Sequence, residues 1–345
     1  MEIVVMKFGG TSVCSEEQRY AAFKHVYREV NAGYKVVVVV SAMGRFGEPY
    51  ATDTLKELVS YNVSKQESDR LLACGEIISS IVISDFFQQQ GLKSIALSPH
   101  DVGIKTNDVY SNAEVERVDV SVIKQYLNTY DVIIAPGFVG TTNTHNIATL
   151  GRGGSDTSAV VLGAALNAVY VDIYSDVEGV MTADPKLVKN ARVLEKISYD
   201  NLIALASRGA KVIHLKAIEY AKNNHVNLRL RQTTKETIGT YVVDQQVNTL
   251  SITYTNQYVR YELRHLDGFV ACEQLVKHGS YWYAKSSDVA DVEKYLQDAQ
   301  ITYEKEEQFV RVSIIDQQTL PLETTYFVEA ARLIDTMNFL HYNLI

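Results

Sequence analysis

Continuous apolar runs recur along the first two thirds of the chain and predict buried strands. The clearest is 35–40, where five consecutive valines follow Lys35. Unbroken apolar runs of this length are typical of parallel strands that are covered by helices on both faces. The further strands predicted in the same way are 3–6, 94–97, 131–136, 169–174 and 226–231.

Segments with helical periodicity separate these runs. Ser15 with Gln18, and Ser64 with Glu67, have the form of capping boxes, and each pair precedes apolar positions spaced three or four residues apart. The further helical patterns are 118–126, 159–166, 199–207 and 215–223, and the polar stretch 137–150 predicts a loop or small hairpin. Alternating strands and helices indicate an α/β fold, with a mostly parallel central sheet sandwiched by helices.

The pattern changes after Thr233. A pair of extended strands is predicted within 249–263, a short helix at 269–277, a strand at 281–284 and a helix at 289–299. The last predicted elements are strands at 301–304 and 309–315 and a helical segment at 326–337. This is the pattern of a small α+β module. With a length of 345 residues, two domains are expected, and we place them at 1–244 and 245–345.

Composition narrows the possible partners. The net charge of −8 argues against nucleic acid or an anionic membrane as the main partner. Three cysteines, Cys14, Cys74 and Cys272, lack metal-ligand spacing and fit reduced thiols. No secretory leader and no apolar run of about 18 residues is evident, so we expect a cytoplasmic protein that does not span a membrane.

Several turns that follow predicted strands carry candidate chemistry. In Lys7-Phe8-Gly9-Gly10-Thr11-Ser12, two glycines let backbone amides approach a ligand closely, and Lys7 could face a phosphate. The glycine loop 151–154 leads into a helix, whose N-terminus is a natural anion site. The loop 175–186 could hold the base and ribose of a nucleotide. Taken singly, each could equally be a solvated turn or surface charge.

Other nucleotide-binding and metal-binding patterns are missing from the sequence. There is no P-loop motif and no G-x-G-x-x-G spacing, so neither a P-loop enzyme nor a dinucleotide fold is supported. The H-R-D signature of protein kinases and zinc motifs are likewise missing.

Six blocks in the same order resemble the aspartate kinases of the amino-acid kinase fold. They are Lys7 to Val13, Ser41 to Gly44, Leu71 to Glu76, Gly151 to Ser158, Ser175 to Lys186 and Gly209 to His214. The segment Arg45 to Leu55 is similar to the bacterial diaminopimelate-sensitive aspartokinase I subgroup. About 240 residues take part in the resemblance.

The resemblance implies phosphoryl transfer from MgATP to the β-carboxylate of L-aspartate, which gives 4-phospho-L-aspartate for lysine, diaminopimelate, threonine and methionine synthesis. It implies Lys7 and Asp156 as catalytic residues. The implied aspartate-binding residues are Ser41, Thr52, Glu76, Arg152, Gly153, Gly154 and Ser155. The implied ATP-binding residues are Lys7, Phe8, Gly9, Gly10, Ser175, Asp176, Met181, Thr182, Ala183, Asp184, Pro185, Lys186 and Lys211. Mg²⁺ would be held mainly by the nucleotide phosphates, with no metal site of the protein's own.

The sequence departs from the family pattern at three places. Met181 stands where many members have an aromatic residue, and Leu215 replaces a frequent proline. The tail resembles ACT modules but is short, so we expect a homodimer joined through it that lysine, threonine or diaminopimelate inhibit weakly or not at all. Two alternatives stay open: another amino-acid kinase of this fold, acting on glutamate or carbamate, and a non-catalytic amino-acid sensor.

Overall fold

The computed structural model describes residues 1–210, 212–247, 249–264, 266, 269–316 and 324–345. It divides into two compact units. Unit 1 comprises Met1–Val180, Val193–Ala206 and Lys211–Gln246, and unit 2 comprises Met181–Arg192, Ser207–Ala210 and Val247–Ile345. The expected division of function at residue 244 stays a prediction. The short segments 181–192 and 207–210 belong to the same compact unit as the C-terminal part of the chain.

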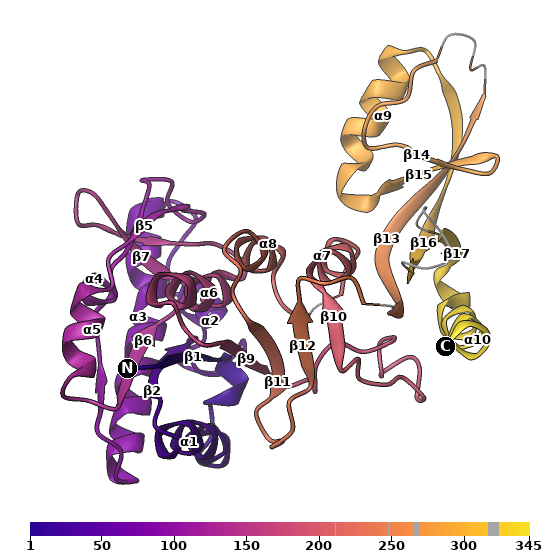
Figure 1. The fold of residues 1–345 in the computed structure, drawn as a ribbon. Coiled ribbons are helices and arrows are strands. Elements are labelled where there is room, and N and C mark those ends of the chain that lie inside the picture. Colours follow the sequence, from indigo (N-terminus) through magenta and orange to yellow (C-terminus); the bar gives the residue numbers. More distant parts are fainter. Residues whose placement is uncertain (211, 248, 265, 267–268, 317–323) are drawn as a thin grey trace. The chain divides into compact units, whose positions relative to one another are not determined.

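An eight-stranded sheet forms the centre of unit 1 (Figure 1). Its strand order is β10-β12-β11-β9-β1-β2-β6-β3, and all neighbours pair in parallel except β11 and β12. The strands are β1 (Ile3–Phe8), β2 (Lys35–Val40), β3 (Ser94–Ala96), β6 (Val132–Pro136), β9 (Val171–Ser175), β10 (Lys196–Ser198), β11 (Leu228–Gln232) and β12 (Thr240–Val243). The predicted α/β class with a mostly parallel sheet is confirmed.

Helices cover both faces of this sheet, and the valine run of β2 shows why. Val36, Val38 and Val40 belong to a core with helices α1 (Glu16–Asn31) and α3 (Lys65–Gln89). On the other face lies α6 (Gly154–Leu166), where a Cβ on Gly163 would be 2.2 Å from a methyl carbon of Val171. A strand buried on both faces needs apolar side chains at every position, so the run is unbroken.

Both predicted serine caps are formed. The Ser15 hydroxyl accepts from the Gln18 amide at the start of α1, and the Ser64 hydroxyl does the same with Glu67 at the start of α3. Helix α3 is long and apolar enough to cross a membrane by length and composition alone. Half of its most apolar window is buried within the protein, and Ile83 and Phe87 pack in the core beneath the sheet. We therefore describe α3 as a core helix of unit 1.

A smaller four-stranded sheet and several short helices complete unit 1. The small sheet has the order β5-β4-β7-β8, with β4 (Ile104–Thr106), β5 (Val115–Val118), β7 (Val139–Thr142) and β8 (Ile147–Thr149). Strands β7 and β8 are the hairpin predicted within 137–150. The remaining helices are η1 (Gly10–Ser12), α2 (Thr52–Lys56), α4 (Pro99–Val102), α5 (Ser121–Leu127), α7 (Tyr199–Ser207) and α8 (Leu215–Asn223).

Unit 2 is built on a five-stranded antiparallel sheet of order β14-β15-β13-β16-β17. The strands are β13 (Leu250–Arg264), β14 (Val276–His278), β15 (Tyr281–Lys285), β16 (Thr302–Asp316) and β17 (Thr324–Glu329). Helix α9 (Val289–Asp298) packs Val292 and Leu296 on one half of the sheet. Helix α10 (Leu333–Leu344) packs Met337 on the other half. Two short 3-10 helices come before these helices: η2 (Ser286–Asp288) precedes α9, and η3 (Ala330–Arg332) precedes α10.

Several element predictions were wrong, mostly in unit 2. Segment 249–263 is one strand instead of two, 301–304 and 309–315 belong to the single strand β16, and 269–277 forms no helix within its described residues. Part of the helical segment predicted at 326–337 is β17. The helix predicted at 118–126 begins only at Ser121, because Val118 is the last residue of β5. In each case cross-strand pairing decides the conformation: β13 and β16 pair along most of their lengths, and β5 pairs with β4.

Candidate active site

Three strands of the central sheet end in turns that lie against one another. The amide of Ser41, after β2, donates to the carbonyl of Phe8 at the end of β1, at 3.2 Å. The amide of Gly44 donates to the carbonyl of Gly10, also at 3.2 Å. Strand β9 pairs with β1 on its other side and ends at Ser175. The carboxyl edge of a parallel sheet is where ligands bind in open α/β folds, and these turns occupy it.

Gly10 is required by the close approach of two of these turns. A Cβ at this position would lie 2.3 Å from the carbonyl oxygen of Ala42 and 3.0 Å from that of Gly44. Both are backbone atoms, so they cannot rotate away as a flexible side chain could. The second glycine of the Gly9-Gly10 pair therefore allows contact between the turns that follow β1 and β2.

Lys7 and Asp156 form an ion pair at this edge. Lys7 Nζ lies 2.7 Å from Asp156 Oδ1, and the two side chains are 12% and 14% exposed. Lys7 belongs to β1, and Asp156 lies in the first turn of α6, so the pair joins the sheet to the start of a helix. The other carboxylate oxygen of Asp156 accepts from the backbone amide of His214 at 3.3 Å. The carboxylate therefore holds the ammonium of Lys7 in place while leaving it partly accessible.

The glycine loop before α6 is folded tightly and presents Arg152. Gly151 and Gly153 both have φ of +73°, a conformation that other residues adopt with strain. A Cβ on Gly153 would lie 2.1 Å from Cγ of His214, so the loop packs directly on that ring. Arg152, between the two glycines, is exposed and has no ion-pair partner within the described parts of the chain. Its guanidinium is thus available to a ligand carboxylate.

Glu76 supplies a buried carboxyl group next to the turn after β2. It lies on α3, is 2% exposed, and its Oε1 accepts from the amide of Ala42 at 3.2 Å. Its Oε2 is also buried and has no hydrogen-bond partner among the residues that the structure describes. Burial raises the pKa of Glu76 to about 8, although the hydrogen bond from Ala42 opposes the shift. A cationic ligand group at Oε2 would favour ionisation of this carboxyl group.

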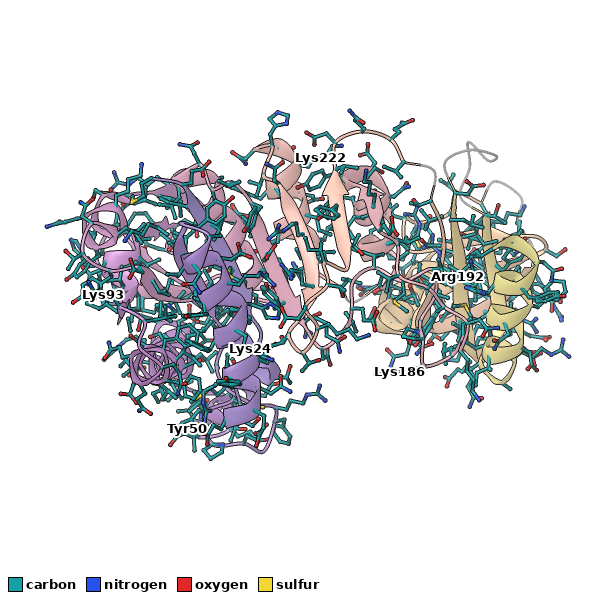
Figure 2. All side chains as sticks on the ribbon, turned by 60° about the horizontal axis from the view of Figure 1, so that its bottom comes forward. Lys24, Tyr50, Lys93, Lys186, Arg192 and Lys222 are labelled. Carbon is teal, nitrogen blue, oxygen red and sulfur yellow. The ribbon has the colours of Figure 1, made fainter. Side chains whose placement is uncertain are left out.

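Gly75, the residue before Glu76, lets α3 approach the β2 turn. A Cβ there would lie 2.8 Å from Cβ of Ala42 and 2.9 Å from the carbonyl oxygen of Tyr50. Of the remaining predicted aspartate residues, Ser41 is half-buried in the β2 turn, and Thr52 begins α2. The nearby Tyr50 side chain is exposed (Figure 2). The Cβ of Ser155 lies 3.0 Å from where a Cβ of Gly137 would be, beside the end of β2.

The predicted ATP residues are divided between the two units. Ser175 and Asp176 lie in unit 1, where Asp176 accepts a hydrogen bond from the exposed Arg45 at 3.1 Å. Residues 181–186 lie in unit 2. There Thr182 and Ala183 are buried, while Lys186 is exposed (Figure 2). Lys211 lies outside the described residues.

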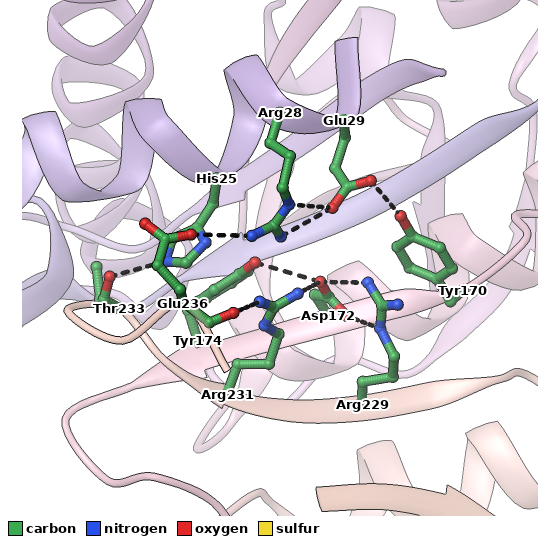
Figure 3. Close-up of polar contacts among 10 residues, drawn as sticks. All are labelled: His25, Arg28, Glu29, Tyr170, Asp172, Tyr174, Arg229, Arg231, Thr233 and Glu236. Carbon is green, nitrogen blue, oxygen red and sulfur yellow. Dashed lines mark hydrogen bonds and ion pairs between the residues drawn. The ribbon is translucent and has the colours of Figure 1, made fainter. Parts of the chain in front are cut away.

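Sequence reasoning missed a polar network that joins α1, β9 and β11 (Figure 3). The Thr233 hydroxyl, beyond the end of β11, donates to the hydroxyl of Ser12 at 2.7 Å. The Thr233 carbonyl accepts from Nε2–H of His25 at 2.9 Å, so this nitrogen carries the ring proton. Burial lowers the pKa of His25 to about 4, which keeps the ring neutral at pH 7. These contacts tie the turn after β1 to α1 and to the end of β11.

Side chains of β9 and β11 extend this network as a buried cluster of charged groups. Asp172 is fully buried and accepts from Arg229 at 2.5 and 2.7 Å and from Arg231 at 3.1 Å. The Tyr174 hydroxyl also donates to Asp172, and the Arg229 guanidinium lies 3.3 Å from the centroid of the Tyr170 ring. The only signal in the sequence was the acid in β9 and the alternating arginines of β11. That pattern does not reveal that the two strands are neighbours.

Comparisons with known proteins support the resemblance. A model of the amino acid kinase family matches residues 2–232. Aspartokinase 1 of Bacillus subtilis is 46% identical over 245 residues, which are 70% of this chain and 61% of that relative. The aspartokinase of Geobacillus stearothermophilus is 42% identical over 268 residues, 75% of this chain and 65% of the relative. The chain thus spans less than two thirds of the length of these relatives.

Solved structures show the same fold. The crystal structure of Escherichia coli aspartokinase III in complex with aspartate and ADP matches with a TM-score of 0.74. The match covers 99% of this chain and 100% of that one, at 21% sequence identity.

Proposed function

Because the chain belongs to the amino acid kinase family, we propose that it is an aspartate kinase, which transfers the γ-phosphoryl group of MgATP to the β-carboxylate of L-aspartate. One observation carries this choice within the family. The edge of the sheet that carries the Lys7–Asp156 pair also carries Glu76 and Arg152. Among the residues that the structure describes, one buried oxygen of the Glu76 carboxyl group has no hydrogen-bond partner and the Arg152 guanidinium has no ion-pair partner. An amino-acid substrate offers the complementary ammonium and carboxylate groups. The aspartokinase relatives support the same choice.

The proposed reaction needs little acid–base catalysis from the protein. A carboxylate with a pKa near 4 is ionised at pH 7 and can attack without a general base. Catalysis then depends on positioning and on neutralising negative charge. The ammonium of Lys7 supplies that charge, and Asp156 holds it in place at 2.7 Å.

We assign the aspartate side of the site to Ser41, Thr52, Glu76, Arg152, Gly153, Gly154 and Ser155. Arg152 grips a substrate carboxylate, and Oε2 of Glu76 accepts from the ammonium, whose charge draws Glu76 into its ionised form. The hydroxyl groups and backbone amides of the others orient the carboxylate that is phosphorylated.

We assign the nucleotide side to the β1 turn and to the segment that follows β9. Backbone amides of Gly9 and Gly10 and the N-terminus of α6 are suited to phosphate groups. Ser175, Asp176, residues 181–186 and Lys211 complete the assignment. No cluster of three or more acidic, histidine or cysteine side chains that could hold a metal is found in the described part of the chain. We propose that Mg²⁺ is held mainly by the nucleotide phosphates.

The assembly and regulation proposals concern unit 2. We propose a homodimer joined through this unit, supported by the exposed side chains of Ile334, Phe339 and Tyr342 on α10. Light scattering on the purified protein tests this, and a monomeric mass at micromolar concentration would refute it. We further propose a cytoplasmic enzyme of lysine, diaminopimelate, threonine and methionine synthesis. We expect lysine, threonine or diaminopimelate to inhibit it weakly or not at all. Strong saturable inhibition of initial rates by lysine, threonine or diaminopimelate would overturn the regulatory part.

The central test follows ADP release with L-aspartate, with L-glutamate and without an acceptor. Turnover that depends on L-aspartate is expected, and absent or aspartate-independent turnover would refute the proposal.

Lys7→Ala tests the role of the ion pair within that assay. We expect kcat to fall by ~10²-fold or more with a smaller change in the KM for aspartate, since Lys7 acts on charge that develops during transfer. Lys35→Ala is the matched control, because Lys35 pairs with Asp131 where β2 and β6 begin, at the opposite edge of the sheet. A raised KM with unchanged kcat would remove Lys7 from this role.

A further inference from the structure

Asp69 is a fully buried carboxylate that none of the roles above uses. It lies near the start of α3 and accepts four hydrogen bonds. Two come from Ser111, through its amide at 2.8 Å and its hydroxyl at 3.2 Å. The other two come from Thr149, through its amide at 2.7 Å and its hydroxyl at 3.0 Å. Each carboxylate oxygen therefore receives one bond from each of two segments that are distant in the sequence.

Of the two segments that Asp69 joins, one leads to the glycine loop and the other packs against it. Thr149 ends β8, and Leu150-Gly151-Arg152 follows it directly. A Cβ on Gly151 would lie 2.7 Å from the side-chain oxygen of Asn112 and 3.2 Å from the carbonyl oxygen of Ser111, so the two segments are in close contact. Thr149 also accepts, through its carbonyl, from the amide of Ala113 at 2.8 Å.

This region holds backbone conformations that need support from their surroundings. Ser111 has φ of +71° and Gly151 has φ of +73°. A left-handed conformation at a residue other than glycine persists when neighbouring contacts fix it. The two bonds from Ser111 to Asp69 are such contacts, and the path of the loop that carries Arg152 depends on them.

The same helix also carries Glu76. It follows Asp69 by seven residues, about two turns, so the two carboxyl groups lie on one face of α3. One rigid helix thus fixes the buried carboxyl that faces the ammonium and, through Asp69, the loop that bears the guanidinium. The distance between two groups that grip one small amino acid must be set closely for both to act together.

We propose that Asp69 is a positioning residue for the aspartate subsite, which fixes the loop of Arg152 relative to Glu76 through its bonds to Ser111 and Thr149. The inference rests on the proposed function, because it takes L-aspartate as the ligand of Arg152 and Glu76. Asp69 itself contacts no substrate in this scheme.

Asp69→Asn is the primary variant, since it keeps the shape of the side chain. The amide group offers one acceptor oxygen, and its NH2 would face donors from Ser111 and Thr149. We expect the KM and the calorimetric Kd for L-aspartate to rise by ~10- to ~100-fold, because loss of hydrogen bonds to a charged group releases the loop. The KM for ATP should rise by a smaller factor than that for L-aspartate. Of the nucleotide side, only the N-terminus of α6 follows this loop, while the turn of Gly9 and Gly10 does not depend on these bonds.

Two further variants keep the test decisive. Thr149→Val removes one hydroxyl donor and keeps the backbone bond, so it should shift the Kd for L-aspartate in the same direction by a smaller factor, even if Asp69→Asn fails to fold. Asp131→Asn is the matched control, because Asp131 pairs with Lys35 at the opposite edge of the sheet, and its kinetics should be those of the wild type.

A double-mutant cycle separates positioning from general stability. If Asp69 acts through Arg152, then Asp69→Asn should change the Kd for L-aspartate by less than about twofold in an Arg152→Ala background. Full additivity in this cycle, or equal effects on L-aspartate and ATP, would overturn the inference. So would wild-type affinity for L-aspartate in both Asp69→Asn and Thr149→Val. A wild-type protein that neither binds nor phosphorylates L-aspartate would instead refute the proposed function, and this inference with it.

Discussion

Because Glu76 is buried, we expect it to destabilise unit 1 as the pH rises. The carboxyl group is 2% exposed, and one of its oxygens has no hydrogen-bond partner within the described residues. Its pKa is raised to about 8 in the folded protein from 4.5 in an ordinary environment. Glu76→Gln replaces it with a neutral side chain of nearly the same shape, which cannot titrate. The variant therefore isolates the cost of ionising this one group.

The sign and size of the effect follow from proton linkage. Between the two pKa values the unfolded chain has released the proton and the folded protein has kept it. The contribution of Glu76 to stability is therefore fully present below the unfolded pKa and is lost as the pH rises through the folded one. Each pH unit costs about 1.4 kcal/mol, so from about pH 5 to about pH 7.5 the wild type should lose roughly 3 kcal/mol relative to Glu76→Gln.

The single tryptophan allows the two units to be followed separately. Trp282 lies in β15, in unit 2, so its fluorescence reports that unit, while far-UV circular dichroism reports both. Urea unfolding of the wild type and of Glu76→Gln should be measured at several pH values in this range. We expect the difference in unfolding free energy to grow steadily with pH in the transition of unit 1, with no change in the Trp282 transition.

Glu57→Gln is the control, because Glu57 is an exposed residue at the end of α2 and its loss should leave the pH dependence unchanged. A constant difference between the wild type and Glu76→Gln from about pH 5 to about pH 7.5 would refute the reasoning. It would mean that Glu76 is solvated or paired well enough to keep an ordinary pKa.

Two further predictions concern packing in unit 1. Asp172→Asn should destabilise unit 1 by ~3–5 kcal/mol, because it leaves Arg231, which is 2% exposed, without its charged partner. A loss below about 1 kcal/mol in circular-dichroism unfolding would show that the arginines find other partners. Gly10→Ala should lower kcat by ~10-fold or more, because its Cβ would lie 2.3 Å from the carbonyl oxygen of Ala42 and force the two turns apart. Wild-type kinetics for this variant would show that the turns separate without disturbing Lys7.

Much of unit 1 could be predicted because its local signals agree with its fold. The five valines after Lys35 indicated a strand buried on both faces, and β2 has that position. The serine caps at Ser15 and Ser64 marked the starts of two helices. Strand ends carry turn residues of recognisable chemistry, and all carboxyl ends of parallel strands lie at one edge. The sequence therefore placed Lys7 and the β2 turn in one site before any contact was known.

Unit 2 was predicted less well because its long strands are held by partners distant in the sequence. The pattern of β16 suggested two short strands, yet pairing with β13 carries one strand through both. Segment 269–277 has helical spacing, but Val276 and Lys277 pair with β15 instead. Local propensity is a weak preference in such segments, and cross-strand pairing overrides it.

The amino-acid sequence by itself determined the family, the α/β class and the residues with candidate chemistry, because these depend on residue type and on spacing along the chain. Only the tertiary structure decided the environments of those residues. Burial of Glu76, the bond between Thr233 and Ser12, and the four bonds that Asp69 receives all join segments far apart in the chain. Burial and long-range hydrogen bonds exist only after strands and helices pack, and they set the charge and position of each group in the site.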